Sequence, residues 1–192
     1  MQSEIQKIIR VLNQGGVVIY PTDTAFGIGC RIDKKDSIKK LFDIRRRPYN
    51  QAVPVLFNSI DMINKYVQNI DEEVNKLMDK YWPGALTIIL PAKIENISDL
   101  VRGGGETIGV RIPNHKAILQ VINEIGIPIL APSANFHGEK TPLKFEDLDK
   151  EIIGKVDYVL RGECSVKQPS TVIDCSVGKW RIVRKGAIEI NL

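Results

Sequence analysis

Apolar residues recur along the chain with two different spacings, which predict alternating helices and strands. Between residues 3 and 14 they recur at helical spacing, with Ser3 placed to cap a helix and Gly15 placed to end it. The run 17–20 is short, apolar and β-branched, which is typical of a buried strand. Because Pro21 cannot donate to a sheet ladder, we expect strand pairing to stop there.

The same two patterns continue to the end of the chain and predict one α/β domain. We expect strands over 28–32, 53–57, 86–90, 107–113, 127–131, 156–160, 172–174 and 180–184. We expect helices from 36 or 37 to before Pro48, within 61–81, over 114–125 and over 145–153. Their first residues, Asp36 or Ser37 and Asn114, are candidate caps, and Gly126 is a candidate helix end. The glycine-rich segment 91–106 predicts a mobile loop.

Three points along the chain share one pattern, a proline followed by small polar residues next to an apolar strand. They are Pro21-Thr22-Asp23-Thr24, Pro132-Ser133-Ala134-Asn135 and Pro169-Ser170-Thr171. Strand ends of α/β proteins are where ligands usually bind, so this repetition suggests a shared polar cavity. An ordinary polar turn between two strands is the alternative for the first of them.

Arginines in two places are candidates for binding an anion. Arg45-Arg46-Arg47 stand at the predicted end of a helix, where the helix dipole favours cations, but arginine forks also clamp phosphate. Arg45 and Arg47 would project to the same side if this segment is extended. Arg111 lies inside an apolar strand, where it either reaches solvent at an edge or binds a carboxylate. For His115, a surface position at a helix start is favoured over catalysis.

The composition narrows the class of protein. The 192 residues are 43% hydrophobic and 26% charged, as in a globular domain, and no apolar run is long enough to cross a bilayer. The N-terminus lacks a secretory pattern, so we expect a cytoplasmic protein. Three cysteines without a paired spacing predict buried thiols rather than a disulfide framework or a zinc site. The net charge of +4 favours anionic ligands such as nucleotides or RNA, unless it is solvated surface.

Seven motifs, in order and at similar spacing, resemble those of the YrdC-like threonylcarbamoyl-AMP synthases. They are PTDTAFGIG, RRRPYNQAVPVL, WPGALTIIL, GVRIP, APSAN, STVID and RKG. The resemblance implies an α/β fold with a strongly twisted, open, mixed sheet, flanking helices and a concave ligand cavity. The family's longer members add a C-terminal domain after the last motif. This sequence stops soon after that motif, so the resemblance implies a single YrdC-like domain over residues 1–192.

The resemblance implies a nucleotidyltransferase that condenses L-threonine, bicarbonate or CO₂, and ATP to threonylcarbamoyl-AMP and pyrophosphate. Magnesium would be carried by the ATP rather than held by the protein. A tRNA threonylcarbamoyl transferase complex would take the product, and double-stranded RNA or tRNA is a further possible partner. Such a reaction depends on positioning and electrostatics and needs no histidine base.

Site residues follow from the same resemblance, position by position. The implied threonine site consists of Thr24, Arg111, Ala131 and Ser170. The implied ATP site consists of Arg45, Arg47, Gln51, Thr107, Ser133, Asn135, Thr141 and Arg184. Arg45, Arg47 and Arg111 would act by positioning and electrostatics, and no residue is assigned as a general acid or base.

Several positions depart from the family pattern, among them Arg31, an unexpected charge after Cys30, and Lys185, where proline is usual. Arg45 stands where a lysine is usual, Leu56 where many long members carry a threonine-contacting histidine, and Phe26 where tyrosine is usual. One alternative is therefore a paralogue that binds nucleotide without threonine-dependent synthesis. Another is an RNA-binding module, although aromatic residues make up only 6% of the chain and do not alternate with basic ones.

Overall fold

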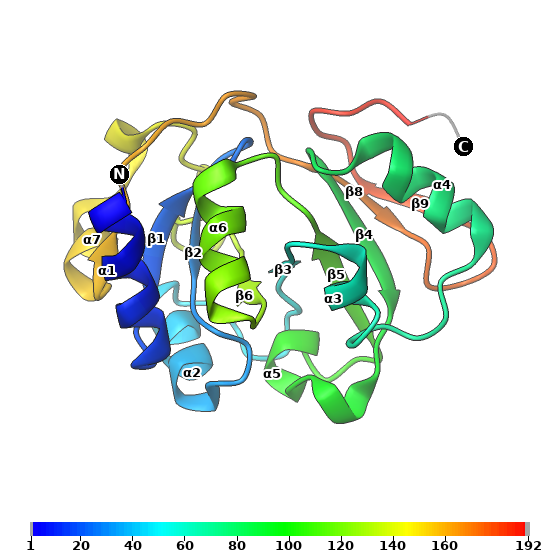
Figure 1. Ribbon diagram of the computed structural model, residues 1–192, viewed down its shortest axis with the longest axis horizontal. Coiled ribbons are helices and arrows are strands. Elements are labelled where there is room, and N and C mark those ends of the chain that lie inside the picture. Colours follow the sequence, from blue (N-terminus) through cyan, green and yellow to red (C-terminus); the bar gives the residue numbers. More distant parts are fainter. Residues whose placement is uncertain (1, 191–192) are drawn as a thin grey trace.

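Short strands and amphipathic helices alternate along the chain in an α/β fold (Figure 1). The computed structural model describes residues 2–190. The helices are α1 (Gln2–Asn13), α2 (Lys35–Ile44), α3 (Ile60–Ile63), α4 (Glu72–Tyr81), α5 (Asp99–Arg102), α6 (Lys116–Ile125) and α7 (Lys150–Lys155), with 3₁₀ turns η1 (Ile94–Asn96) and η2 (Phe145–Asp147). The strands are β1 (Val18–Pro21), β2 (Phe26–Gly29), β3 (Val55–Leu56), β4 (Leu86–Pro91), β5 (Thr107–Arg111), β6 (Ile129–Leu130), β7 (Tyr158–Val159), β8 (Thr171–Asp174) and β9 (Arg181–Arg184).

The strands form two mixed sheets that share one hydrogen-bonded seam. The smaller sheet has the order β2-β1-β7, and the larger has the order β6-β3-β5-β4-β8-β9. Segments 26–32 and 128–134 run antiparallel and exchange backbone hydrogen bonds, including Ile28 N to Pro132 O at 2.9 Å and Leu130 N to Cys30 O at 2.9 Å. The seam therefore joins β2 to β6, and the two sheets continue into one another.

Two glycines in β2 allow a tyrosine to pack against this seam. Tyr20 is fully buried, and its hydroxyl donates to the carbonyl of Leu130 at 2.6 Å. A Cβ on Gly29 would lie 2.9 Å from the Tyr20 ring, and one on Gly27 would lie 3.0 Å from it. The glycines that bracket Ile28 are thus required by close packing, because no larger residue leaves room for the tyrosine.

Helices cover the sheets and close the core. The predicted helix near the N-terminus is confirmed as α1, which buries Ile5, Ile8, Ile9 and Leu12. In Figure 1, α1 and α6 lie side by side on one face, and a hydrogen bond of 2.8 Å from Gln6 to Glu124 connects them.

Several predicted helix starts are wrong, although the two predicted glycine ends are right. Ser3 lies inside α1 rather than before it, and Ser37 lies inside α2, where it donates to Gly15 O at 2.6 Å. The residue before α6 is His115 rather than Asn114, and its side chain makes no cap hydrogen bond. Asp36 also lies within α2. Gly15 and Gly126 both have positive φ values and end their helices, as predicted from the freedom of glycine.

The predicted strands exist, with shifted or shorter bounds. β2 starts at Phe26 rather than at residue 28, and β1 runs through Pro21, which pairs with Phe26 at the sheet edge. The prediction of a loop over 91–106 is wrong in part, because this segment holds the short helices η1 and α5. Side-chain contacts order it: Ser98 accepts from Leu100 N, and Arg102 pairs with Asp99.

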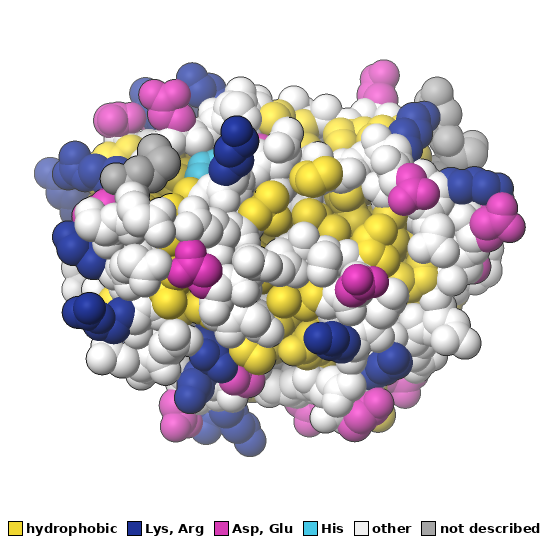
Figure 2. Space-filling view, in the orientation of Figure 1, with side chains coloured by type: hydrophobic (Ala, Val, Ile, Leu, Met, Phe, Trp, Pro, Cys, Tyr) yellow, Lys and Arg dark blue, Asp and Glu magenta, His cyan; other side chains and the backbone are white. Residues whose placement is uncertain are grey.

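Charged side chains of both signs ring the face seen in Figure 2, around a middle where hydrophobic side chains gather. The net positive charge is therefore not concentrated on this face. Among residues 2–190, no helix is long and apolar enough to span a membrane. The three cysteines are all buried free thiols, as the sequence predicts.

Candidate functional site

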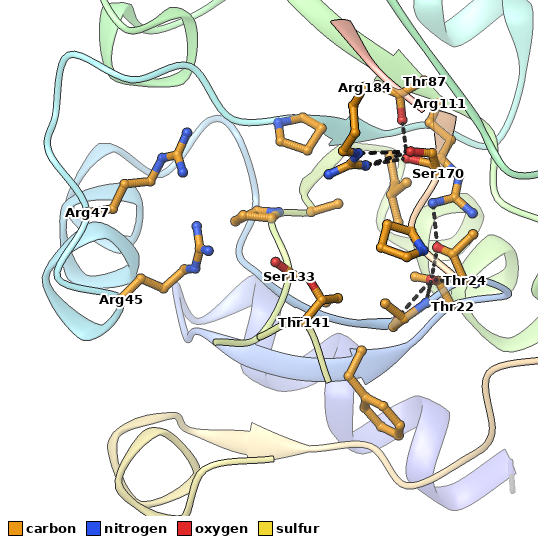
Figure 3. Close-up of a pocket in the computed structure, with 18 residues that line it drawn as sticks. Thr22, Thr24, Arg45, Arg47, Thr87, Arg111, Ser133, Thr141, Ser170 and Arg184 are labelled. Atoms are coloured by element: carbon orange, nitrogen blue, oxygen red, sulfur yellow. Dashed lines mark hydrogen bonds between the residues drawn. The ribbon is translucent and has the colours of Figure 1, made fainter. Parts of the chain in front are cut away.

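A cavity of about 200 Å³ opens where the three proline corners meet (Figure 3). Thr22 and residues 24–27 line one part, 131–133 a second and 169–170 a third. The remaining lining residues are Arg45, Arg47, Pro54, Leu56, Thr87, Arg111, Thr141 and Arg184. The corners are far apart in sequence, and the sheets bring them together through the β2–β6 seam and the β4–β8 ladder.

Arg111 is held from three sides at the end of β5. Its Nε donates to Gly84 O at 2.8 Å, Nη1 to Thr24 Oγ1 at 2.8 Å, and Nη2 to Asp23 Oδ1 at 2.6 Å. Asp23 and Arg111 are both almost completely buried, so this is an interior ion pair. The alternative of an edge arginine that reaches solvent is therefore wrong. A guanidinium has five N–H groups, and these bonds leave two for a ligand carboxylate.

The third corner presents hydroxyl groups beside a second arginine. Ser170 Oγ lies 2.9 Å from Thr87 Oγ1, and Arg184 Nη2 donates to Ser170 Oγ at 3.0 Å and to Ser170 O at 2.8 Å. Figure 3 shows the guanidinium of Arg184 between that of Arg111 and those of Arg45 and Arg47. The pKa of Arg184 is lowered mainly by partial burial and, to a smaller extent, by the nearby charge of Arg111.

The chain after β9 folds back onto this corner and fixes it. Thr171 Oγ1 donates to Ile188 O at 2.6 Å and accepts from Gly186 N at 3.1 Å and from Ile188 N at 3.0 Å. A Cβ on Gly186 would lie 2.5 Å from the backbone of Ser170. The position of Ser170 therefore depends on glycine at 186.

A turn at the end of α2 separates the three consecutive arginines. Arg46 N bonds to Asp43 O and Arg47 N bonds to Phe42 O, both at 3.0 Å, which is a Schellman ending. Arg46 takes the left-handed conformation with φ 52°, a position usually given to glycine. The sequence analysis expected Arg45 and Arg47 to face one side only if this segment were extended. The segment is instead helical at Arg45 and left-handed at Arg46.

The left-handed turn nevertheless gives that arrangement. Arg45 and Arg47 line the cavity, whereas Arg46 faces away, pairs with Glu151 at 2.7 Å and stacks over Phe136 at 4.0 Å. One backbone conformation therefore turns alternate arginines to opposite sides.

Three of the four cavity arginines have no acidic partner. None of the ion pairs within residues 2–190 includes Arg45, Arg47 or Arg184. Arg45 is 3% exposed, its Nε donates to Asn135 O at 3.0 Å, and its Nη1 is buried without a partner. Burial, aided by the charge of Arg47, lowers the pKa of Arg45 to about 10. Uncompensated buried cations of this kind are costly, and a polyanionic ligand would relieve that cost.

The structure places most of the expected site residues on the cavity and three of them elsewhere. The cavity is lined by Thr24, Arg45, Arg47, Arg111, Ala131, Ser133, Thr141, Ser170 and Arg184. Asn135 lies outside the lining, donates to Phe136 O and Glu139 O, and accepts from Arg45 through its backbone carbonyl. Gln51 makes backbone hydrogen bonds, accepting from Arg47 Nε at 3.4 Å and donating to Pro48 O at 3.3 Å. Thr107 begins β5 opposite Pro91.

Sequence reasoning assigned no role to two residues that shape the site. Thr87 is the polar residue of the apolar strand β4, the same signal that singled out Arg111 in β5. Asp23 stands within the first corner, but its ion pair with Arg111 crosses 88 positions of sequence. The departures Leu56 and Phe26 both lie on the lining and are almost completely buried.

His115 is half-buried rather than fully on the surface. Its Nδ1 is buried without a hydrogen-bond partner, and burial lowers the pKa of the side chain. It does not line the cavity, which agrees with the interpretation that it is not catalytic.

The fold and cavity define an α/β protein in which four arginines and several hydroxyl groups line one cavity. The chain belongs to the Sua5/YciO/YrdC family, because the model of that family, described as "Telomere recombination", matches residues 10–186. The resemblance seen in the motifs is thereby confirmed.

Relatives across nearly the whole chain are named threonylcarbamoyl-AMP synthase. One from Bacillus subtilis is 35% identical over 96% of this chain and 54% of its own length. One from Vibrio parahaemolyticus is 30% identical over 94% of this chain and 98% of its own length. The chain thus spans about half of the first relative and nearly all of the second.

Solved structures show the same fold. A Pyrococcus abyssi Sua5 in complex with L-threonine superposes with a TM-score of 0.90 at 30% identity, over 95% of this chain and 54% of the other. The E. coli YciO structure gives a TM-score of 0.87 at 26% identity, over 97% of this chain and 90% of the other. These confirm the expected α/β fold with mixed sheets and flanking helices.

Proposed function

We propose that this chain is a threonylcarbamoyl-AMP synthase, a nucleotidyltransferase that uses L-threonine, bicarbonate or CO₂, and ATP. The observation that carries the proposal is the division of one cavity into two halves. One half contains Arg111 bonded to Thr24, together with the paired hydroxyls of Thr87 and Ser170, and the other holds arginines without acidic partners. The first half suits a small amino acid with a hydroxyl side chain, and the second suits a triphosphate.

In the threonine half, the protein would bind both ends of the amino acid. The two remaining N–H groups of Arg111 would donate to the threonine carboxylate. The hydroxyls of Thr24 and Ser170, and the backbone of Ala131, would orient the amine toward the rest of the cavity. CO₂ would add to the amine to give a carbamate and release a proton.

In the ATP half, Arg45, Arg47 and Arg184 would bind the phosphates, with Ser133 and Thr141 beside them. A carbamate oxygen would attack the α-phosphorus in line, and the bond to the pyrophosphate leaving group would break. Arg45, Arg47 and Arg184 each donate to a backbone carbonyl before the reaction, so they would stabilise the developing charge without reorganising.

The lining offers hydroxyls and guanidiniums but no carboxylate, and residues 2–190 contain no cluster of His, Cys, Asp and Glu side chains that could hold a metal. Because magnesium prefers carboxylate and phosphate oxygens, these residues do not fit a protein-held ion. We therefore assign magnesium to the phosphates of ATP and give it no protein ligand.

The test of the proposal is pyrophosphate release by the purified protein. We expect release from ATP only when threonine and bicarbonate are both present, with threonylcarbamoyl-AMP identified by mass spectrometry. Release that does not depend on threonine would refute the proposal. A matched control omits bicarbonate and purges CO₂, which should stop release while ATP binding persists.

A paralogue without threonine-dependent synthesis is the second candidate, because Leu56 and Phe26 make the lining more apolar than the family pattern. Calorimetry separates the two: the synthase binds threonine in the presence of ATP, and the paralogue binds ATP alone. We also propose that a tRNA threonylcarbamoyl transferase complex takes the product. Direct binding of tRNA or double-stranded RNA stays a prediction, which a salt-dependent binding isotherm tests.

Gly186 provides a test of the third corner. We expect Gly186→Ala to raise the KM of threonine about tenfold, because the new methyl group would displace Ser170. The KM of ATP should change less, since Arg184 is the only one of the three phosphate-binding arginines that contacts Ser170. Steady-state kinetics measures both constants.

The matched control is Gly178→Ala, where a Cβ meets nothing within 4 Å and which lies in the turn between β8 and β9. It should leave both constants unchanged. An unaltered threonine KM in correctly folded Gly186→Ala would show that the returning chain does not position Ser170.

A further inference from the structure

Asp23 separates the four cavity arginines into two electrostatic classes. It lies 2.6 Å from Arg111 Nη2, and both side chains are almost completely buried. The other three arginines of the cavity are in none of the ion pairs within the described chain. A ligand in one cavity of about 200 Å³ therefore meets one neutralised arginine and three that keep their full charge.

We propose that Asp23 is a specificity-determining residue that keeps phosphates out of the threonine half of the cavity. This inference rests on the proposed function and adds to it how the cavity directs threonine to one half and the phosphates of ATP to the other. Among the hydrogen-bond partners of Arg111 in the described residues, Asp23 is the charged one, because Gly84 O and Thr24 Oγ1 accept hydrogen bonds but carry no charge.

The argument depends on how strongly each arginine attracts a polyanion. Coulombic attraction within a cavity is large when the water is excluded, and a carboxylate in contact with a guanidinium cancels most of its field. Arg111 can then bind a ligand through its two remaining N–H groups but gains little from additional negative charge. A zwitterion with one carboxylate satisfies those two groups, whereas a triphosphate gains more from Arg45, Arg47 and Arg184.

The sorting matters because the two halves adjoin. Figure 3 shows Arg184 next to Arg111, and Ser170 contacts Arg184 on one side and Thr87 on the other. Without Asp23, Arg111 would become a fourth unpaired cation within the same cavity. Pyrophosphate or the phosphates of ATP could then occupy the place of threonine.

The experiment uses inorganic pyrophosphate as the probe and the wild-type chain beside Asp23→Asn. Asparagine is nearly isosteric and can still accept from Arg111, but it removes the negative charge. In the wild type, pyrophosphate should inhibit threonylcarbamoyl-AMP formation competitively with ATP and not with threonine. In Asp23→Asn it should also compete with threonine, with an inhibition constant against threonine at least tenfold lower.

A purely structural role of Asp23 would give a different result, since loosening of the site raises the threonine KM without creating competition by pyrophosphate. An unchanged inhibition pattern in folded Asp23→Asn would overturn the proposal. If the wild type shows no threonine-dependent activity at all, the proposed function fails instead, so the two failures are distinct.

The double variant Asp23→Asn/Arg111→Met covers the case in which the single variant does not fold. It removes both members of the pair and leaves no buried charge behind. Calorimetric titration with pyrophosphate should then give an affinity within twofold of the wild type, because Arg111 contributes no contact to that anion. A loss of tenfold or more would show that Arg111 binds phosphate in the wild type and would overturn the proposal.

Discussion

Arg111→Lys is expected to raise the KM of threonine by about 10- to 150-fold, the equivalent of about 1.5–3 kcal/mol for a charge-assisted hydrogen bond. Lysine keeps a positive charge beside Asp23 but lacks the planar fork that reaches Gly84 O, Thr24 Oγ1 and a ligand carboxylate together. The KM of ATP should change by less than about threefold, because the paired arginine contributes little to the phosphates. Steady-state kinetics with each substrate varied in turn measures both effects.

Lysine is preferred to alanine at this position because alanine would leave Asp23 buried and unpaired. Breaking a buried pair in that way costs about 3–5 kcal/mol, enough to unfold many domains of this size. Arg181→Lys is the matched control, since Arg181 pairs with Asp174 at 3.0 Å but is 74% exposed and outside the cavity. Equal threonine KM values for Arg111→Lys and the wild type would show that Arg111 does not bind the carboxylate.

Arg45→Met is expected to weaken ATP binding by about 10- to 150-fold while it stabilises the unliganded protein. The loss of affinity follows from removing a charged group that faces the cavity without a carboxylate partner. The gain in stability follows because burial of a guanidinium costs several kcal/mol, whereas the lost hydrogen bond to Asn135 O contributes about 1 kcal/mol. Calorimetry with ATP and thermal unfolding without ATP measure the two effects.

The pKa of Arg45 gives the sign of the stability effect. Burial lowers that pKa to about 10, well below its ordinary value, so the folded state disfavours the protonated form. This destabilisation is fully present below pH 10 and is relieved as the pH rises through the folded pKa. At neutral pH, Arg45→Met should therefore raise the melting temperature by about 2–4 °C for each kcal/mol gained.

The neighbouring residue provides the control for this prediction. Arg46→Met removes a guanidinium from the same turn, but that guanidinium faces outward toward Glu151. Because exposed ion pairs contribute about 0–1 kcal/mol, both ATP affinity and melting temperature should stay near the wild type. If Arg45→Met lowers the melting temperature, the buried charge of Arg45 does not destabilise the unliganded protein, and the prediction is wrong.

The elements of the fold were largely predictable because they depend on short-range patterns. The helical spacing of Ile5, Ile8, Ile9 and Leu12 gave α1, and glycines 15 and 126 ended their helices as expected. Cap positions were less predictable, since several polar residues near each helix start can accept the same backbone hydrogen bonds. The helices within 91–106 were missed because Ser98, Asp99 and Arg102 stabilise them by side-chain contacts that a glycine-rich composition hides.

The sequence by itself determined the proline corners with their hydroxyls, the arginine-rich turn and the family to which the chain belongs. Those features are local, so backbone preference and residue order are sufficient to specify them. Only the tertiary structure decided that Asp23 neutralises Arg111 and that Gly186 fixes Ser170. The physical reason is that charge pairing and steric contact depend on distance in space, and the sheets alone bring together residues as far apart as 23 and 111.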